Sequence, residues 1–314
     1  MSNASAIEFE RHRAFLTRLA YSMLGSLADA QDIVQDAFLR WHGSIPADLA
    51  SPRAWLAKIV TRLCLDWMKS ARARREDYVG PWLPEPVLER FASPPPAVDD
   101  RIDAPVALML ALERLSPLER AVFILHDLFD MEIGEIAEAI DRNEAACRQL
   151  VARARGHVGQ TRQRFAVDAD EAARLATAFF EATRSGNATV LRDMLAEAAT
   201  LHSDGGGKRP ASLNILFSAD KISRFFAGLF QKSDPEDRSR MRWSRPLWIN
   251  GLPGYVSIDA KGTIQTTALE VEGGKILAVY VIRNPDKLAD AEAFLTDGAA
   301  ESGGDVRPIR APGS

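Results

Sequence analysis

Apolar residues recur at helical spacing through the first part of the chain. The pattern covers residues 9–24, 29–41 and 51–75 and predicts three amphipathic helices, of which the first two pair as a helical hairpin. Asp29 is expected to cap the second helix, because its carboxylate can accept a free backbone N–H at the positive helix end. Ser51 suits the start of the third helix. The apolar stripe of the second helix consists of Ile33, Val34, Ala37, Phe38 and Trp41.

A proline-rich break separates this block from a second helical one. Residues 78–104 hold six prolines and lack a helical period, which predicts an extended linker. The tryptophan of the WLPEP sequence, residues 82–86, either packs against a neighbouring helix or anchors the linker in another domain. Helices are then expected over residues 106–115 and 117–129, the second of them capped by Ser116.

Residues 132–155 have the pattern of two short helices joined by a tight turn at residues 141–143. The second helix is basic, and Ala145, Leu150, Val151 and Ala154 are its expected inward positions. This order is that of a helix-turn-helix, whose second helix enters the DNA major groove.

The last third of the chain changes from helices to strands. Helical patterns over residues 169–185, 190–194 and 222–230 precede strand-like segments, and residues 287–295 could form a last short helix. Helices followed by an antiparallel meander predict an α+β domain. The strand-like segments are residues 242–249, 254–258, 263–270 and 275–282, and residues 201–204 could close a further strand.

The predicted fold class is therefore multidomain, with two all-α domains followed by an α+β domain. We expect an all-α domain at residues 1–75, a linker at 76–104 and a helix-turn-helix domain at 105–165. The α+β domain is expected at residues 166–296, and the polar, glycine-rich residues 297–314 are expected to be a disordered tail.

Charge is sharply segregated along a chain whose net charge is only −4. Residues 53–75 carry seven basic residues and one acidic, and residues 142–164 carry six and one; residues 76–141 between them carry fifteen acidic and four basic. The basic blocks are either solvated helix faces or two phosphate-binding surfaces held in check by the acidic segment. The sharp segregation favours the second interpretation.

The composition limits the class of protein to which this chain can belong. The chain lacks an apolar run long enough to span a bilayer and a signal pattern at its start, so a cytoplasmic protein without membrane contact is expected. Cys64 and Cys147 lie in helical patterns and are expected to be buried, reduced thiols. Two cysteines do not complete a structural zinc site, and neither a metal nor a cofactor is expected.

The two basic blocks supply the candidate DNA contacts. The first combines cations with aromatic side chains that could stack on unpaired bases, although a core position is the more typical one for each tryptophan. The second places side chains near the start of a recognition helix, with arginines suited to phosphate. The first set is Arg53, Trp55, Lys58, Arg62, Trp67, Lys69 and Arg72. The second set is Arg142, Asn143, Glu144, Arg148, Gln149, Arg153 and Arg155.

The residue sequences of these segments resemble those of a known family. GSLADAQDIVQDAFLRWH at residues 25–42 resembles the polymerase-docking helix of bacterial sigma factor region 2, of the extracytoplasmic-function type. The segment at residues 51–75 resembles the family's minus-ten recognition and melting segment, departing at Arg62, where many members carry Asn. LSPLER at residues 115–120 with the helix-turn-helix resembles region 4, which reads the minus-thirty-five element.

The resemblance implies a sigma factor that brings core RNA polymerase to promoter DNA and initiates transcription without catalysing a reaction itself. Region 2 would grip the clamp helices of the largest polymerase subunit, and the flap region of the polymerase is a further expected partner. The first basic set would capture the minus-ten DNA, and the second would read the minus-thirty-five duplex. The implied core-docking residues are Asp29, Asp32, Gln35 and Asp36.

Three further motifs resemble a subgroup, the SigJ-like group, with a fused SnoaL-like α+β cone. They are WLPEP at residues 82–86, DGGGK at 204–208 and NPDKL at 284–288. The resemblance implies that the cone is a built-in regulator of transcription that contacts the linker or the sigma regions. The implied regulatory residues are Trp82, Leu83, Pro84, Asp204, Gly205, Gly206, Gly207, Lys208, Asn284, Pro285, Asp286, Lys287 and Leu288.

Two alternatives remain open from the sequence. Some SnoaL-like cones are enzymes that use a pocket Asp or His, and His202 with Asp204 is the only obvious pair here. The cone could also bind a small-molecule ligand as a sensor without turnover. A glycine run as short as that of residues 205–207 lacks the spacing of a phosphate-binding loop.

Overall fold

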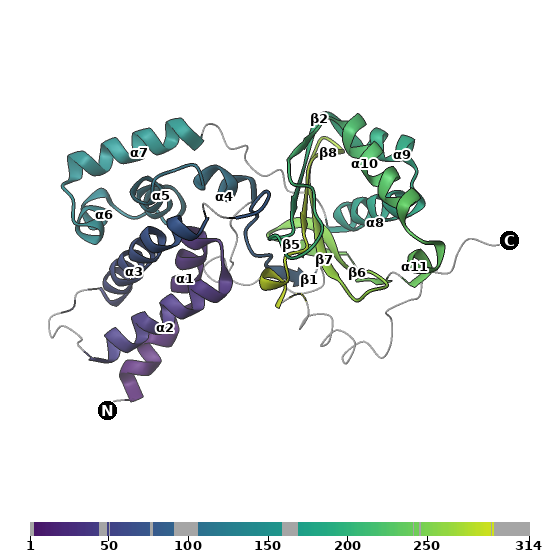
Figure 1. Ribbon diagram of the computed structural model, residues 1–314. Helices are drawn as coiled ribbons and strands as arrows, with labels where there is room; N and C mark the ends of the chain where they lie inside the picture. Colours follow the sequence, from purple (N-terminus) through teal and green to yellow (C-terminus); the bar gives the residue numbers. More distant parts are fainter. Residues whose placement is uncertain are drawn as a thin grey trace. The chain divides into compact units, whose positions relative to one another are not determined.

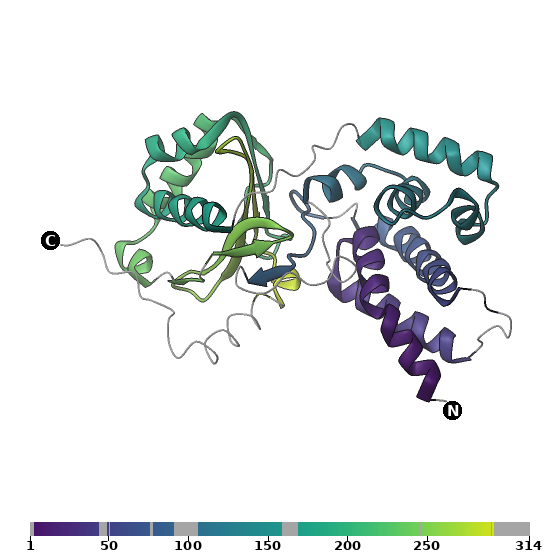
Figure 2. The same ribbon diagram turned by 180° about the vertical axis from the view of Figure 1, so that it is seen from behind.

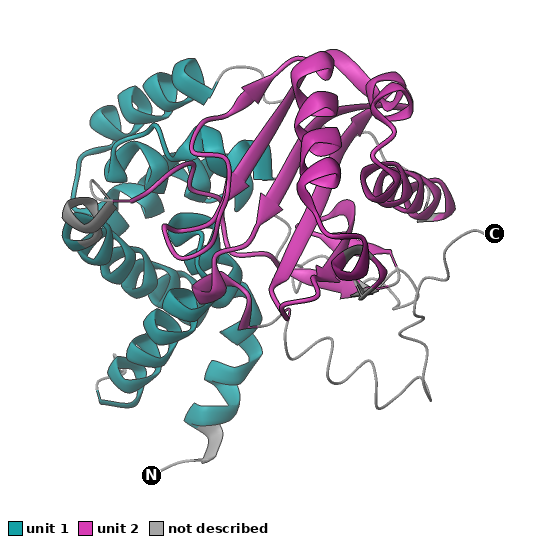
Figure 3. Ribbon diagram, turned by 45° about the vertical axis from the view of Figure 1, so that its right-hand side comes forward, with its two compact units in different colours: residues 1–77, 94–162 teal, residues 78–93, 163–314 magenta. Residues whose placement is uncertain are grey.

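The computed structural model describes residues 3–43, 49, 51–75, 78–90, 106–158, 169–240, 242–244, 246–289 and 291. The chain divides into two compact units, coloured separately in Figure 3. Unit 1 comprises residues 1–77 and 94–162, and unit 2 comprises residues 78–93 and 163–314. The WLPEP motif therefore belongs to the same compact unit as the C-terminal domain. The predicted tail at residues 297–314 lies outside the described residues.

Unit 1 consists of helices, as the sequence predicts (Figure 1). A π-helical segment, Ile124–Leu128, continues directly from the end of α5. The helices are α1 (Asn3–Leu24), α2 (Leu27–Gly43), α3 (Pro52–Arg75), α4 (Val106–Leu112), α5 (Pro117–Phe123), α6 (Ile133–Ile140) and α7 (Glu144–Val158).

Short polar signals begin several of these helices. The Ser51 hydroxyl accepts the Ala54 N–H, and Ser116 forms a reciprocal capping box with Glu119, so both predicted caps are confirmed. The predicted cap at Asp29 is wrong. Ser26 takes that place, because its hydroxyl accepts the Asp29 N–H at 3.2 Å and α2 already begins at Leu27.

One buried cation joins the first three helices to those that follow. The Arg120 side chain is 5% exposed, and its guanidinium donates to the carbonyl oxygens of Leu112 and Met23. The same group pairs with Glu113 at 2.7 Å. Because its donors have partners, this arginine can be buried between α1, α4 and α5 without an uncompensated charge.

Unit 2 has the predicted α+β order. The helices are α8 (Ala169–Ser185), α9 (Ala188–Met194), α10 (Ala219–Lys232) and α11 (Pro235–Arg240). The strands are β1 (Leu88–Arg90), β2 (Leu195–Asp204), β3 (Leu216–Phe217), β4 (Arg242–Trp243), β5 (Leu247–Ile249), β6 (Leu252–Ile258), β7 (Ile264–Glu272) and β8 (Lys275–Ile282). Their order in the sheet is β1-β5-β6-β7-β8-β2-β3, with β4 paired to β6. Strands β2 and β8 are parallel, and every other pair is antiparallel.

The core of unit 2 lies between one face of this sheet and α8, α9 and α10. Phe179 and Phe180 of α8 meet Tyr255 of β6 and Val279 of β8 there, all of them buried. The Phe180 ring stacks on Trp243 with centroids 4.3 Å apart. Burial of this apolar surface holds the helices on the sheet.

Several predicted boundaries in unit 2 and on α7 are wrong. The expected strand at residues 242–249 is two short strands, β4 and β5. Residues 201–204 do close a strand as expected, because β2 runs from Leu195 to Asp204. Residues 285–287 form a 3-10 turn, η3 (Pro285–Lys287), instead of a helix start, and the segment expected to follow is mostly outside the described residues. On α7 the expected inward residue Ala145 is exposed, and Cys147 is buried in its place.

The linker contributes a strand to the sheet of unit 2. Leu88 to Arg90 pair antiparallel with Ile249 to Leu247, so β1 forms one end of the sheet. In the front and back views β1 lies beside the yellow η3 turn that contains the NPDKL motif (Figures 1 and 2). The extended linker expected from its prolines is thus a strand in part.

Gly254 is the tightest point of the sheet and gives a test of its packing. A Cβ at this position would lie 2.3 Å from the Thr267 carbonyl oxygen. We expect Gly254→Ala to destabilise unit 2 by about 1–3 kcal/mol through overpacking. Gly228→Ala on α10 meets no atom within 4 Å and should be neutral or stabilising by up to about 1 kcal/mol. Thermal unfolding of the two variants measures the difference, and equal melting curves would contradict the packing argument.

Candidate linker clamp and nucleic-acid-facing helices

Asp204 is the centre of a polar cluster at the end of β2. Its side chain has 0% exposure and its carboxylate accepts hydrogen bonds from four donors. The donors are the Tyr78 hydroxyl at 2.5 Å, the Leu83 N–H at 2.9 Å, the Gly206 N–H at 3.0 Å and the Lys287 ammonium at 2.7 Å. Two of the four come from the linker, so this carboxylate attaches the linker to the C-terminal domain. We name Tyr78, Leu83, Asp204, Asn284 and Lys287 the linker clamp.

Lys287 holds the linker from the other side. Its ammonium donates to the Leu83 carbonyl oxygen at 2.5 Å, so Leu83 is bound through both its N–H and its C=O. The same ammonium lies 4.5 Å from the centre of the Trp82 ring and 5.0 Å from that of Tyr78. A cation between two aromatic rings and a buried carboxylate is stabilised by both kinds of contact. Leu83, at 0% exposure, is the fully buried apolar anchor of the motif, whereas Trp82 is partly exposed.

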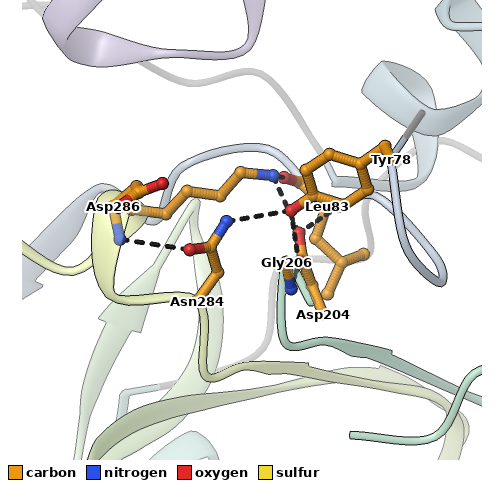
Figure 4. Close-up of polar contacts among 7 residues, drawn as sticks. Tyr78, Leu83, Asp204, Gly206, Asn284 and Asp286 are labelled. Carbon is orange, nitrogen blue, oxygen red and sulfur yellow. Dashed lines mark hydrogen bonds and ion pairs between the residues drawn. The ribbon is translucent and has the colours of Figure 1, made fainter. Parts of the chain in front are cut away.

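Asn284 completes the cluster, as Figure 4 shows. Its amide donates to the Tyr78 hydroxyl at 2.9 Å, and its carbonyl oxygen accepts the Asp286 N–H at 3.1 Å. The Arg283 and Asn284 N–H groups both donate to the Asp204 main-chain oxygen. Residues that are far apart in the sequence as WLPEP, DGGGK and NPDKL therefore meet at one place.

The backbone geometry explains why glycines stand in the DGGGK motif. Gly206 has φ +58°, and a Cβ there would lie 2.4 Å from the Asn284 amide nitrogen. Gly205 would bring a Cβ to 2.2 Å from the Arg209 carbonyl oxygen. The run is therefore a tight turn that carries the Gly206 N–H to Asp204. Lys208 pairs with Asp286, but both side chains are more than half exposed, so this pair contributes little.

Other linker contacts extend along the sheet edge. Val87 and Asn250 exchange two hydrogen bonds, one from each N–H.

Burial raises the pKa of Tyr78, and the bond to the negative Asp204 carboxylate raises it further, so its hydroxyl remains a donor. Tyr78 and Asn250 were not among the expected site residues. An aromatic residue four positions before Trp82 in a proline-rich linker was the one sequence signal for Tyr78.

The core-docking set lies on α2. Asp32, Gln35 and Asp36 are exposed on the side opposite the buried stripe, and Asp29 is partly buried in the first turn. Leu39 belongs to the same outward side and is 61% exposed. The face is thus acidic and amide-bearing with one apolar side chain.

The minus-ten set lies on α3. The Arg53 guanidinium lies 4.1 Å from the centre of the Phe15 ring, and Lys69 pairs with Asp66. Trp55 packs edge-on against Trp41 and, like Trp67, is partly buried. Lys58 and Arg62 contact α6. Arg72 belongs to α3, but its side chain is outside the described set.

The minus-thirty-five set lies at the turn before α7 and along it. The Asn143 side chain caps α7 by accepting the Ala146 N–H, and Arg142 donates to the Asp141 carbonyl oxygen. Arg148 and Gln149 are exposed. Three arginines have acidic partners in the same unit: Arg148 with Glu144, Arg153 with Glu119 and Arg155 with Asp127.

Asp127 shows how one such pair is held. It lies in the π-helical segment after α5, within hydrogen-bond distance of Arg155 and His126. Partial burial works against its ionisation, but the hydrogen bonds from Arg155 and His126 outweigh this and keep the pKa of Asp127 below its ordinary value. The carboxylate therefore stays charged and partly neutralises the positive charge of Arg155.

The pair considered for catalysis is not brought together by a hydrogen bond among the described contacts. The His202 Nε2 atom lies 3.2 Å from the Thr200 hydroxyl, and its ring lies 5.3 Å from that of Tyr280. Asp204 is engaged by its four donors. Among the described residues there is no cluster of three His, Cys, Asp or Glu side chains that could hold a metal ion, and no helix there is long and apolar enough to cross a membrane.

Comparison with known proteins agrees with this arrangement. Residues 9–74 match the family described as sigma-70 region 2, and residues 106–158 match sigma-70, region 4. The chain is 38% identical to the ECF RNA polymerase sigma factor SigJ of Mycobacterium tuberculosis over 89% of its own length and 92% of the relative. It is 29% identical to the probable ECF RNA polymerase sigma factor SigI of the same organism, over 91% and 96% of the two chains.

The crystal structure of Mycobacterium tuberculosis SigJ is similar throughout. It aligns with a TM-score of 0.71 and 33% identity over 90% of this chain and 98% of SigJ. The predicted fold class, two all-α sigma domains with a C-terminal α+β domain, is confirmed.

The fold and the two matched regions define a promoter-specificity factor of the transcription machinery. The chain belongs to the extracytoplasmic-function RNA polymerase sigma factors. It directs core RNA polymerase to specific promoters and initiates transcription, and it carries an additional C-terminal domain.

Removing the Asp204 charge should release the linker. Asp204→Asn leaves Lys287, whose side chain is only 12% exposed, without its counter-ion. Breaking a buried pair in this way costs about 3–5 kcal/mol. We expect amide hydrogen exchange of the segment around Leu83 to accelerate about a hundredfold or more, because local opening becomes easier by that free energy. Hydrogen-exchange mass spectrometry measures the rate. Asp286→Asn, whose pair with Lys208 is exposed, is the matched control and should leave exchange unchanged. Unchanged exchange in Asp204→Asn would contradict the clamp.

Proposed function

We propose that three surfaces of this sigma factor carry its separate tasks. Asp29, Asp32, Gln35 and Asp36 of α2 bind the clamp helices of the largest polymerase subunit. The α3 set, Arg53, Trp55, Lys58, Arg62, Trp67, Lys69 and Arg72, captures minus-ten DNA. The α7 set, Arg142, Asn143, Glu144, Arg148, Gln149, Arg153 and Arg155, reads the minus-thirty-five duplex, with the polymerase flap as partner of the same domain. The exposure of Asp32, Gln35, Arg148 and Gln149 supports this assignment.

The proposed regulator is the linker clamp. The single observation that carries this part is the buried Asp204 carboxylate with four donors, two of them from the linker. A clamped linker has less freedom than a loose one, so the distances it can bridge between the two DNA-reading domains are restricted. We propose that the C-terminal domain thereby sets the spacing between the minus-ten and minus-thirty-five readers. Trp82, Leu83 and Pro84 are the linker residues that the domain holds.

The proposal assigns the C-terminal domain a regulatory role and not a catalytic one. The Asp204 carboxylate is engaged by the clamp, where four donors occupy it. The packing of Phe179, Phe180 and Tyr255 between sheet and helices supports a filled interior over a ligand-sensing one. Because this protein acts on promoter DNA, its location is the cytoplasm.

Promoter spacing tests the clamp. Promoters are first selected from a randomised library by the wild-type holoenzyme, and their spacers are then shortened or lengthened by a few base pairs. Wild-type protein should transcribe the original spacing best. Asp204→Asn should reduce that preference at least about threefold in multi-round run-off transcription, because a released linker accepts more distances. Trp82→Ala should act in the same direction more weakly.

Asp286→Asn is the control for this experiment, with wild-type spacing preference expected. Unchanged preference in both Asp204→Asn and Trp82→Ala would refute the role of the clamp. Failure of the wild-type protein to produce any promoter-dependent transcript would refute the whole proposal.

The α7 assignment predicts two different defects. Arg148→Ala should cost about 1–3 kcal/mol of binding to the preferred duplex and relax the choice of base at one position. Arg153→Ala should weaken binding to all sequences and lower the salt dependence by about one counter-ion, as expected for a phosphate contact. Fluorescence anisotropy with a set of single-base duplex variants at several salt concentrations separates the two. If both variants lose affinity uniformly, Arg148 does not read a base.

A further inference from the structure

Helix α3 contacts the first helix of the helix-turn-helix through two cations. The Arg62 guanidinium donates from Nε to the Ala139 carbonyl oxygen at 3.0 Å and from Nη2 to the Glu138 carbonyl oxygen at 3.2 Å. The Lys58 ammonium lies 3.8 Å from the Glu138 carboxylate. All of these residues belong to unit 1.

The end of α6 explains why a guanidinium binds there. The last carbonyl groups of a helix lack intrahelical donors and carry the negative end of the helix dipole. Asp141 ends α6 in the left-handed conformation with φ 56°, and its N–H and that of Arg142 both go to the Ala137 oxygen. Neither of these two donors serves Glu138 or Ala139. The planar fork of Arg62 binds both of their oxygens and so caps α6 from another helix.

This contact affects the two DNA-facing helices differently. Lys58 and Arg62 of α3 are bound by α6, a helix of the helix-turn-helix, whereas Arg148 of α7 pairs with Glu144 of its own helix and Gln149 is exposed. In this arrangement α6 occupies two cations of the minus-ten reader.

Promoter geometry requires this arrangement to open. Elements centred near minus ten and minus thirty-five are separated by about 25 base pairs, which is on the order of 85 Å along straight duplex DNA. Helices α3 and α6 are instead in hydrogen-bond contact. Region 2 and region 4 therefore have to separate before one molecule can read both elements.

We propose that Lys58 and Arg62, bound to Glu138 and Ala139 of α6, form an intramolecular clasp that closes the minus-ten reader in the free protein. The clasp is separate from the linker clamp, since it lies entirely within unit 1. It rests on the proposed function in one respect, the assignment of Lys58 and Arg62 to minus-ten DNA. Engagement of core polymerase and promoter exchanges these contacts for phosphate.

Charge reversal on α6 tests the clasp without changing a proposed DNA-binding residue. Glu138→Lys in the full-length protein places a cation beside Lys58 and Arg62, and Glu181→Lys on α8 makes the same change of net charge in unit 2. The probe is fluorescently labelled oligothymidylate. We expect Glu138→Lys to bind it about tenfold more tightly than wild type, and Glu181→Lys to gain less than about threefold, because only the first frees α3. Glu138→Gln, which adds no cation, should show an intermediate gain. Equal gains for Glu138→Lys and Glu181→Lys would overturn the proposal.

A zero-length carbodiimide cross-link measures the closed state directly. The reagent activates a carboxylate, an amine attacks it, and an amide forms with the net loss of water taken up by the reagent. We expect a Lys58–Glu138 cross-linked peptide from the free wild-type protein and its loss in the promoter-bound holoenzyme. Absence of the cross-link in the free protein, or its persistence at full yield in the holoenzyme, would overturn the clasp.

These outcomes separate the clasp from the assignment it rests on. If the cross-link forms and Glu138→Lys has no effect on oligothymidylate binding, while Arg62→Ala has none either, the minus-ten assignment of α3 fails. If Arg62→Ala weakens binding in the Glu138→Lys background but the cross-link never forms, the assignment holds and the clasp fails.

Discussion

The pair of the buried Asp204 carboxylate with Lys287 is the interaction on which the regulatory half of this protein depends. A carboxylate removed from water is tolerated only when a cation and further donors replace its hydration, and here the Tyr78 hydroxyl and two main-chain N–H groups supply the rest. The donors come from the linker, the glycine turn and the NPDKL motif. The linker and the C-terminal domain are therefore joined through one side chain.

The contacts in unit 1 are of two kinds, and their burial separates them. Arg120 of α5 is buried and has partners on α1 and α4, so its removal would leave unpaired groups in the core. The pairs on α3 and α7, such as Arg148 with Glu144, are mostly exposed and individually weak. Phosphate groups can therefore replace these exposed ion pairs without unfolding unit 1. The acidic segment between the two basic blocks supplies several of these partners, including Glu119, Asp127 and Glu138.

The mixed sheet of unit 2 serves as a platform with different uses at different places. Its buried face carries the aromatic core against α8 and α10, while β1 from the linker extends the sheet beyond β5. The end of β2, parallel to β8, brings Asp204 beside the residues that follow β8. This parallel pairing is why two motifs separated by about eighty residues share one main-chain oxygen.

The helical elements of unit 1, the α+β order of unit 2 and the family could be predicted from the sequence. This was possible because hydrophobic periodicity, helix caps and motif residues are local properties. Periodicity also predicts α6, its turn and α7 closely, and the motifs WLPEP, DGGGK and NPDKL can be singled out from the sequence. Only the tertiary structure decided how these motifs meet: that Leu83 is the buried anchor, that Tyr78 reaches Asp204, and that Arg62 caps α6. The misplaced cap at Asp29 and the divided strand at residues 242–249 have the same cause. Hydrogen-bond partners far apart in the chain, or competing nearby caps, are chosen by packing, which local patterns do not contain.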